Sequence, residues 1–383
     1  MGSSCGKFPT APAHPSDSDR VTATAISSWT EADLVAAVDA MTAAKEAAQN
    51  GQLLAATAPP NSMPRGLPSD MNEWTFNIWT VASELLPQLA FFALTSHPEL
   101  SAPISQIDKD KLWLFVNEVA ARYHVRPFHS FRHAVDVLLA ASTLLRTVRR
   151  DHPEVLADPV EAGALLVAAL VHDTNHPGCM NSYLVATSHP LAAETPQSVL
   201  ERHHTEVALA LLDREPLDFL SALPADKRSR FITLVRDAVL ATDVTTTMPA
   251  MKAFTATVSE GKAPETGALM AMLIKAADIS NPARSLKVYQ RWIDGVMLEF
   301  FAQGDAEKAR GLPISMNCDR QTVEVPKAQV GFITFLVGPL FEALHLYTPS
   351  LSPIVKQLEA NRAHFANATP AMVQTPATGA ADK

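Results

Sequence analysis

Apolar residues recur at helical spacing through most of the chain, from about residue 71 to residue 365. Long segments rich in Ala, Leu and Val are punctuated by proline, and the alternation typical of strands is hard to find. The pattern predicts main helices over 109–122, 132–150, 159–173, 198–213, 226–242, 265–278, 284–303 and 326–347. We therefore expect an all-α fold with short links between its helices.

The two ends of the chain and a segment near residue 60 lack this pattern. Residues 1–28 are rich in Ser, Thr, Pro and Ala, which is typical of an arm without regular structure. A helix is expected over 30–49, where Thr30 can cap the N-terminus, and 58–70 holds four prolines, which is typical of a linker. We expect three parts: an N-terminal arm with this helix and linker (1–70), a helical domain (71–365) and a disordered tail (366–383).

The composition is that of a globular protein. The 383 residues are 47% hydrophobic and 19% charged, and the helical part is long enough to bury a core. Apolar stretches such as 164–171 are shorter than the ~20 residues that span a bilayer, and no secretory signal pattern opens the chain. Three cysteines fit a reducing compartment, so we expect a cytoplasmic protein.

The net charge of −9 narrows the possible partners. It argues against general nucleic-acid binding, which needs a basic face that releases counterions. A protein this acidic needs local positive charge to handle an anionic substrate, and metal ions are a natural source.

Histidine and aspartate gather at the ends of apolar helices. His129 and His133 lie four residues apart, so they share one helix face. His172 and Asp173 end a second apolar segment, and Asp278 ends a third. Two imidazoles and two carboxylates suit one metal site.

A lone histidine at a helix end is more often a capping or hydrogen-bonded residue than a ligand. We interpret His97, His152 and His345 in that way. The recurrence of the pattern gives His133 and the three residues grouped with it more weight as metal ligands, although spacing alone does not establish that they converge.

Seven runs of the sequence resemble a known family. They are PFHSFRHAVDV, HDTNHPG, SVLERHH, LATDV, KAADISNPAR, EFFAQGDAEKARG and KAQVGFITF. The body is similar, across about residues 110 to 345, to the catalytic domain of the class I cyclic nucleotide phosphodiesterases, which depend on zinc. The resemblance implies a compact all-α fold of about sixteen helices, an HD-type metal-dependent phosphohydrolase domain.

The resemblance also implies residue roles at a two-metal site. The ligands of a tightly bound zinc would be His133, His172, Asp173 and Asp278. Asp173 would bridge to a second ion, magnesium or manganese, and a hydroxide held between the metals would be the nucleophile. His129 would be the general acid that protonates the leaving 3′ oxygen. Residues that hold metal waters or orient a histidine would be His176, Glu201 and Thr242.

Substrate binding is implied at five positions. Gln329 would hydrogen-bond the purine edge, while Phe332 and Val296 would clamp the base. Asn281 is typical of the cAMP-specific branches, and Trp292 would form a wall of the pocket. Phe332 and Val296 could instead be ordinary core residues, and structural packing explains Trp292 equally well.

Several residues depart from the family pattern. Phe128 and Ser130 flank His129 where tyrosine and asparagine are usual. Thr247 stands where a histidine is common, which we interpret as a packing variation. Met316 and Asn317 replace a Pro-Met pair near the pocket rim, where substrate preference could shift.

We therefore expect hydrolysis of 3′,5′-cyclic nucleotides, cAMP in preference to cGMP. The alternatives are a dual-specificity or cGMP-preferring phosphodiesterase, another HD-type phosphohydrolase, and a non-catalytic cAMP-binding protein. The first 70 residues are too few for a typical GAF or PAS domain. Gly2 and Cys5 suggest myristate plus palmitate, although Gly6 departs from the myristoylation pattern, so membrane association is expected only if they are acylated.

Overall fold

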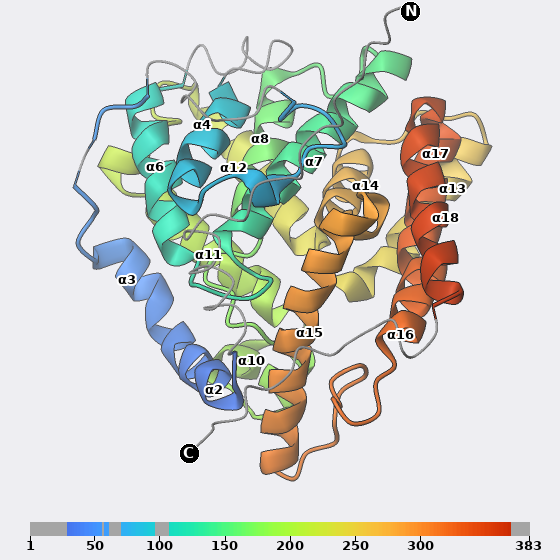
Figure 1. Cartoon of the computed structure of the whole chain (residues 1–383). Helices are drawn as coiled ribbons and strands as arrows, with labels where there is room; N and C mark the ends of the chain where they lie inside the picture. The colour runs from blue at the N-terminus through green and yellow to red at the C-terminus, as the bar shows by residue number, and fades with distance from the viewer. Residues whose placement is uncertain (1–28, 56, 61–69, 96–106, 369–383) are drawn as a thin grey trace, which may run out of the picture.

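The computed structural model describes residues 29–55, 57–60, 70–95 and 107–368, and within these ranges every regular element is helical (Figure 1). The all-α class expected from the sequence is confirmed. The expected acylation sites at Gly2 and Cys5 lie outside the described residues. So do residues 61–69 of the proline-rich segment and the tail beyond residue 368.

The helix bounds follow the proline punctuation closely. Near the N-terminus, α2 (Glu31–Ala40) and α3 (Ala44–Asn50) flank the 3₁₀ turn Met41–Ala43, and α4 covers Leu86–Thr95. The remaining α-helices are α6 (Lys109–Arg122), α7 (Phe131–Asp151), α8 (Pro159–Val171), α9 (Asn181–Ala186), α10 (Pro190–Glu194), α11 (Val199–Leu212), α12 (Ala225–Ala241), α13 (Thr247–Ser259), α14 (Thr266–Asp278), α15 (Leu286–Ala309), α16 (Val325–Phe332), α17 (Gly338–Tyr347) and α18 (Ser352–Ala366).

The helix expected over 326–347 is interrupted. A π-helical turn, Ile333–Val337, separates α16 from α17. Pro339 lies two residues after this turn and has no amide hydrogen to continue the α-helical ladder. By length and composition the whole segment Val325–Tyr347 could cross a membrane, which corrects the expectation that every apolar stretch is too short. Nearly half of its most apolar stretch is buried, and its helices pack against α13 and α18, so packing in the fold accounts for its apolar character.

Helix α8 forms the centre of the main core. Its residues from 160 to 171 are all buried, as expected for a helix that is apolar on every side. It packs against α7, α12 and α14. The core therefore fixes the N-terminal end of α7 relative to the C-terminal ends of α8 and α14, where the candidate metal ligands lie.

The N-terminal helices pack against the body of the protein. Leu34 and Val38 of α2 join a second apolar cluster with Tyr183 of α9 and Leu200 of α11. In Figure 1, α2 lies beside α10 at the lower end of the molecule. Helix α2 also contacts α15, and α3 contacts α11. The segment expected to be helical over 30–49 thus packs, as α2 and α3, against helices that come later in the chain.

Two glycines let neighbouring backbone approach α15 closely. A Cβ at Gly295 would overlap the carbonyl oxygen of Pro127, and one at Gly304 would overlap that of Cys318. The loop before α7 and the loop after α15 therefore both lie directly against this helix.

Candidate metal centre

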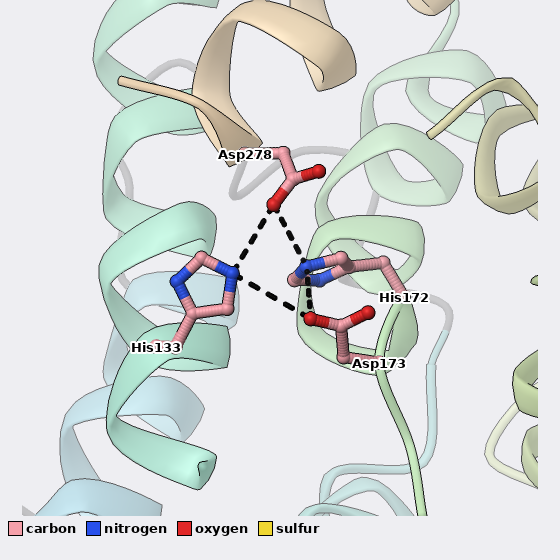
Figure 2. Close-up of side chains that lie close together, drawn as sticks. All are labelled: His133, His172, Asp173 and Asp278. Atoms are coloured by element: carbon pink, nitrogen blue, oxygen red, sulfur yellow. Dashed lines mark hydrogen bonds and ion pairs between the residues drawn. The ribbon is translucent and has the colours of Figure 1, made fainter. Parts of the chain in front are cut away.

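Four side chains from three helix ends meet at one point (Figure 2). His133 lies in the first turn of α7, His172 and Asp173 follow α8, and Asp278 is the last residue of α14. Asp278 Oδ1 lies 3.1 Å from His133 Nε2 and 3.2 Å from His172 Nε2. Asp173 Oδ2 lies 3.1 Å from His172 Nε2 and 3.6 Å from His133 Nε2. The structure thus brings together all four residues that the sequence predicts as ligands of one metal.

The donor atoms fit a cation. The Nδ1 atom of His172 donates to the carbonyl oxygen of Ala169 at 2.9 Å, which leaves Nε2 directed at the two carboxylates. This buried Nε2 has no hydrogen-bond partner among the described residues, although two carboxylate oxygens lie close to it. A metal ion between these atoms would satisfy them all, and imidazole with carboxylate oxygen is a ligand set that zinc accepts.

The electrostatics of the cluster also demand positive charge. Burial lowers the pKa of His172, but Asp173 and Asp278 outweigh burial and raise it well above the ordinary range. Burial opposes ionisation of Asp278, yet the charges and hydrogen bonds of His172 and His133 bring its pKa to about 2. Burial likewise opposes ionisation of Asp173, but His172 holds the pKa of this carboxyl well below its ordinary range. Both carboxylates are therefore ionised at neutral pH, and a proton or a metal ion must balance them.

A second group of possible ligands shares Asp173. It comprises Asp173, His176 and His204 of α11, whose donor atoms lie within 4.8 Å of one another. His204 Nδ1 is bound to the carbonyl oxygen of Thr174 at 2.8 Å, so Nε2 faces Asp173 Oδ1 at 3.6 Å. Burial lowers the pKa of His204 to about 4, so the ring is neutral, and its Nε2 can accept a hydrogen bond from a metal-bound water or coordinate a metal.

The loop after Asp173 is held by side-chain amide contacts. Asn175 has a left-handed backbone with φ of +65°, a conformation that asparagine tolerates better than most residues. Its Nδ2 donates to His124 Nε2 at 2.7 Å, and its Oδ1 accepts from His203 Nε2 at 2.9 Å. Burial lowers the pKa of His203 to about 3, so this contact is between neutral groups.

His129 lies beside the metal group and is oriented by Glu299 of α15. The Glu299 carboxylate accepts from the backbone N–H of Phe128 at 2.7 Å and of His129 at 3.0 Å. His129 Nδ1 lies 2.5 Å from Glu299 Oε2, and its ring stacks on His176 with centroids 3.7 Å apart. Burial lowers the pKa of His129, but Glu299, with Asp173 and Asp278, outweighs burial and raises it. The ring is thus favoured in its protonated form.

Of the three residues expected to hold water or orient a histidine, His176 belongs to the group of possible ligands that shares Asp173. Glu201 accepts two hydrogen bonds from Asn181 Nδ2, and burial raises its pKa to about 7. The Thr242 hydroxyl donates to the carbonyl oxygen of Val239 in its own helix at 2.8 Å. No hydrogen bond between described residues directs Glu201 or Thr242 to the four ligands.

The residues expected to bind the base occupy different environments. Gln329 is buried, and its Oε1 accepts from the Tyr289 hydroxyl at 2.6 Å. The buried Asn281 opens the turn that follows Asp278. Phe332 and Val296 are half-buried and pack against the core.

Trp292 is the expected wall residue that the structure surrounds with packing contacts. It is 1% exposed, and its ring lies 4.6 Å from Trp79, 5.4 Å from Phe128 and 5.7 Å from His133. With so little exposed surface, the Trp292 ring packs beside the His133 imidazole as part of the core.

Each departure from the family pattern has a structural setting. Phe128 lies in an aromatic group, 4.7 Å from the His133 ring. Ser130 occupies the N-cap of α7, yet its hydroxyl makes no capping bond and contacts the Phe128 carbonyl oxygen at 3.3 Å. Met316 is 84% exposed, and Asn317 adopts a left-handed φ of +64°.

Thr247 is explained by a residue that the sequence did not single out. The ammonium group of Lys275, 3% exposed, donates to Thr247 Oγ1 at 3.2 Å, to Thr246 Oγ1 at 2.8 Å and to the Asp243 carbonyl oxygen at 3.0 Å. Thr247 therefore accepts a hydrogen bond from Lys275, a residue that lies about one helical turn before Asp278 in α14.

Sequence reasoning missed Glu299 and Tyr289 as site residues. Glu299 stands inside the apolar run VMLEFFA, and a charged residue in such a run is a signal that it has a buried partner. Tyr289 gives no comparable signal, because tyrosine is common on half-buried helix faces.

The fold and the converging side chains define an all-helical protein with an HD-type candidate metal centre. Residues 128–358 match the family model described as 3′5′-cyclic nucleotide phosphodiesterase. Since this match covers more than half of the chain, the protein belongs to that family.

Two curated relatives illustrate the similarity in sequence. The chain is 36% identical over 257 residues to a 3′,5′-cyclic-AMP phosphodiesterase isoform of Drosophila melanogaster, covering 64% of this chain and 38% of that protein. It is 33% identical over 319 residues to the 3′,5′-cyclic-AMP phosphodiesterase 4C of Rattus norvegicus, covering 79% and 59%. The matched region is 21% of a longer Drosophila isoform. The chain therefore spans less than two thirds of the length of these relatives.

Solved structures show the same fold. LmjPDEB1 in complex with IBMX superposes with a TM-score of 0.73 at 27% identity, over 84% of this chain and 96% of that one. The phosphodiesterase domain of a RhoPDE fusion protein from the choanoflagellate Salpingoeca rosetta gives 0.72 at 27% identity, over 78% and 95%.

Proposed function

We propose that the protein hydrolyses 3′,5′-cyclic nucleotides to 5′-nucleotides and prefers cAMP. The observation that carries this proposal is the meeting of His133, His172, Asp173 and Asp278 beside the His129–Glu299 pair. Membership of the cyclic nucleotide phosphodiesterase family supports it, as do relatives described as 3′,5′-cyclic-AMP phosphodiesterases.

We assign two divalent ions to the site. Zinc suits the four-residue group, because that group offers two imidazoles and two carboxylates. Magnesium or manganese suits the position next to Asp173, since these hard cations favour oxygen ligands and keep several waters. When bound, such ions neutralise phosphate oxygens and make water a nucleophile near neutral pH. His176 and His204, neutral and buried, would orient waters there.

His129 would act as the general acid at the leaving 3′ oxygen. Its Nδ1 is bound to Glu299, so the proton for transfer is on Nε2. The raised pKa of His129, which Glu299 and the carboxylates of Asp173 and Asp278 cause, favours retention of this proton. Phe128 and Ser130, the flanking departures, leave the His129–Glu299 contact intact.

Gln329 and Tyr289 support preference for a single base. An amide that turns freely can serve adenine or guanine, because its oxygen accepts and its nitrogen donates. The Tyr289 hydroxyl donates to Gln329 Oε1 and so fixes one orientation. This favours one nucleotide over dual specificity. Asn281 is buried and follows Asp278 closely in the chain. It is the additional polar group that favours adenine.

Turnover and metal content of the purified protein test the proposal together. We expect hydrolysis of cAMP to 5′-AMP with higher kcat/KM than for cGMP, and zinc detected by mass spectrometry of the digested protein. Equal or greater kcat/KM for cGMP would remove the cAMP preference alone. Binding of cAMP without turnover would instead favour a non-catalytic sensor, and hydrolysis of other phosphoesters alone would favour another HD-type enzyme.

The protein's location is a separate proposal. We infer a cytoplasmic protein that associates with membranes only if Gly2 and Cys5 are acylated. Intact mass measured on protein from its native cell would test this, because an unmodified Gly2 rules out myristate.

A further inference from the structure

Trp29 reaches the candidate active site from outside the segment that matches the family. It directly precedes Thr30, the N-cap of α2, whereas the family match begins at residue 128. Its indole ring lies under the guanidinium of Arg126, with the Arg126 Cζ 4.5 Å from the ring centroid. A Cβ placed on Gly178 would lie 3.3 Å from Trp29 Cζ2. The ring therefore lies over Arg126 in the loop before His129 and close to the backbone of the loop after His176.

The start of α2 holds Trp29 in this position. Thr30 and Asp33 form a capping box, in which the Thr30 side chain accepts from the Asp33 N–H and Asp33 accepts from the Thr30 N–H. Trp29 packs against the apolar cluster that contains Leu34, five residues on. A capping box with an apolar contact across the first turn fixes the angle at which the chain enters a helix.

Both contacts of Trp29 lead to the same carboxylate. Arg126 is half-buried and interacts electrostatically with Glu299. Gly178 has a φ of +93°, and a Cβ there would lie 3.6 Å from the Glu299 Cδ and Oε2 atoms. Glu299 in turn binds His129 Nδ1 and the backbone N–H groups of Phe128 and His129.

We propose that Trp29 is a positioning residue for hydrolysis, which holds Arg126 and the Gly178 loop against Glu299 and so fixes His129. This role rests on the proposed function, because it acts through the general acid. The N-terminal helix is then part of the catalytic unit, and it contributes through one ring rather than through any contact with substrate or metal.

The expected signature is a loss of rate without a loss of binding. His129 acts in the chemical step, so a misplaced imidazole lowers kcat and leaves ground-state binding unchanged. Trp29→Ala should lower kcat roughly 3- to 30-fold, the rate equivalent of a cation–π contact. KM should stay within about twofold, and metal content should be unchanged. Trp29→Phe, which keeps an aromatic face for Arg126, should retain most of the rate.

A double-mutant cycle separates positioning from general destabilisation. In the His129→Ala background, Trp29→Ala should have no further effect on kcat, because the residue through which it acts is absent. Arg126→Met provides a second route if Trp29→Ala does not fold, and it should show the same dependence on His129. Lys45→Ala breaks only the exposed pair with Glu206 at the other end of the N-terminal helices, and it should leave kcat unchanged.

The outcomes are distinct. Equal losses in both backgrounds, a rise in KM in place of the fall in kcat, or no change in active protein would each overturn the role of Trp29. Wild-type protein that hydrolyses no cyclic nucleotide would refute the proposed function instead.

Discussion

Replacing Glu299 by glutamine keeps the volume of the side chain and removes its charge. Glu299 Oε1 accepts two backbone N–H groups, at 2.7 Å and 3.0 Å, and Oε2 accepts the His129 Nδ1–H at 2.5 Å. Glutamine offers one oxygen and one amino group. If its oxygen serves the backbone, the amino group faces His129. If the oxygen serves His129, the amino group faces two N–H donors.

Both orientations weaken the general acid. In the first, His129 avoids a clash of donors by moving its Nδ1 proton, which leaves a neutral ring that is a poor acid. In the second, buried N–H groups lose their acceptor, which costs about 1–3 kcal/mol. A penalty of that size, realised in the transition state, corresponds to a roughly 5- to 150-fold fall in kcat. The loss cannot exceed that of removing His129 itself, which we expect to be about 10²–10⁴-fold.

The pH dependence gives a second readout. The pKa of His129 is raised above its ordinary value of 6.5, so wild-type activity should persist above that pH and fall only as the proton is lost. Glu299→Gln should move this alkaline limb to lower pH, because the carboxylate that raises the pKa has gone.

Steady-state hydrolysis of cAMP, followed by chromatographic release of 5′-AMP across pH, measures both effects. Asp294→Asn is a matched control, since it removes an exposed carboxylate from the same helix and should change neither kcat nor the limb. A Glu299→Gln enzyme with wild-type kcat and an unmoved limb would refute the reasoning.

Four further predictions concern single residues. Asp278→Ala should abolish turnover and lower bound zinc, because it removes a carboxylate that faces both imidazoles; retention of full metal content and activity would exclude it as a ligand. His129→Ala should keep its metal while kcat falls roughly 10²–10⁴-fold, and metal loss would show that the division of roles is wrong. Tyr289→Phe should lower the ratio of kcat/KM for cAMP over cGMP, because the amide of Gln329 can then turn; an unchanged ratio would contradict this. Burial raises the pKa of Glu201 to about 7 from the ordinary 4.5, so the contribution of this carboxyl to wild-type stability falls as pH rises through this window. The melting temperature of Glu201→Gln should therefore exceed that of wild type more at about pH 8 than at about pH 5, and a gap that does not widen would count against a buried neutral carboxyl.

Local sequence patterns predict much of the fold. The bounds predicted for 109–122 are those of α6, because apolar spacing and an acidic N-cap are both local properties. Helix α13 was not expected, since Pro249 interrupts the pattern. A proline in the first turn of a helix is tolerated, because its missing N–H has no partner there.

The candidate site was predictable where it follows from motifs and unpredictable where it depends on distant pairing. The four candidate ligands each end or begin an apolar segment. The resemblance to a family then indicated that they bind one metal. The contact between His129 and Glu299 spans 170 residues of sequence, and no local pattern states which helix faces which loop. The same limit applies to Trp29, whose partners are set by how α2 docks onto α15.

The glycines of α15 limit how the protein can be engineered for heat resistance. Exchanging a helical glycine for alanine commonly stabilises a protein, by about 0.5–1 kcal/mol where the new methyl group has room. Gly267 in α14 is such a position, since a Cβ there meets nothing within 4 Å. At Gly295 and Gly304 the same methyl group would strike the carbonyl oxygens of Pro127 and Cys318. Pro127 lies two residues before His129. An alanine at Gly295 chosen for thermostability would therefore displace the loop that carries His129 and lower the catalytic rate.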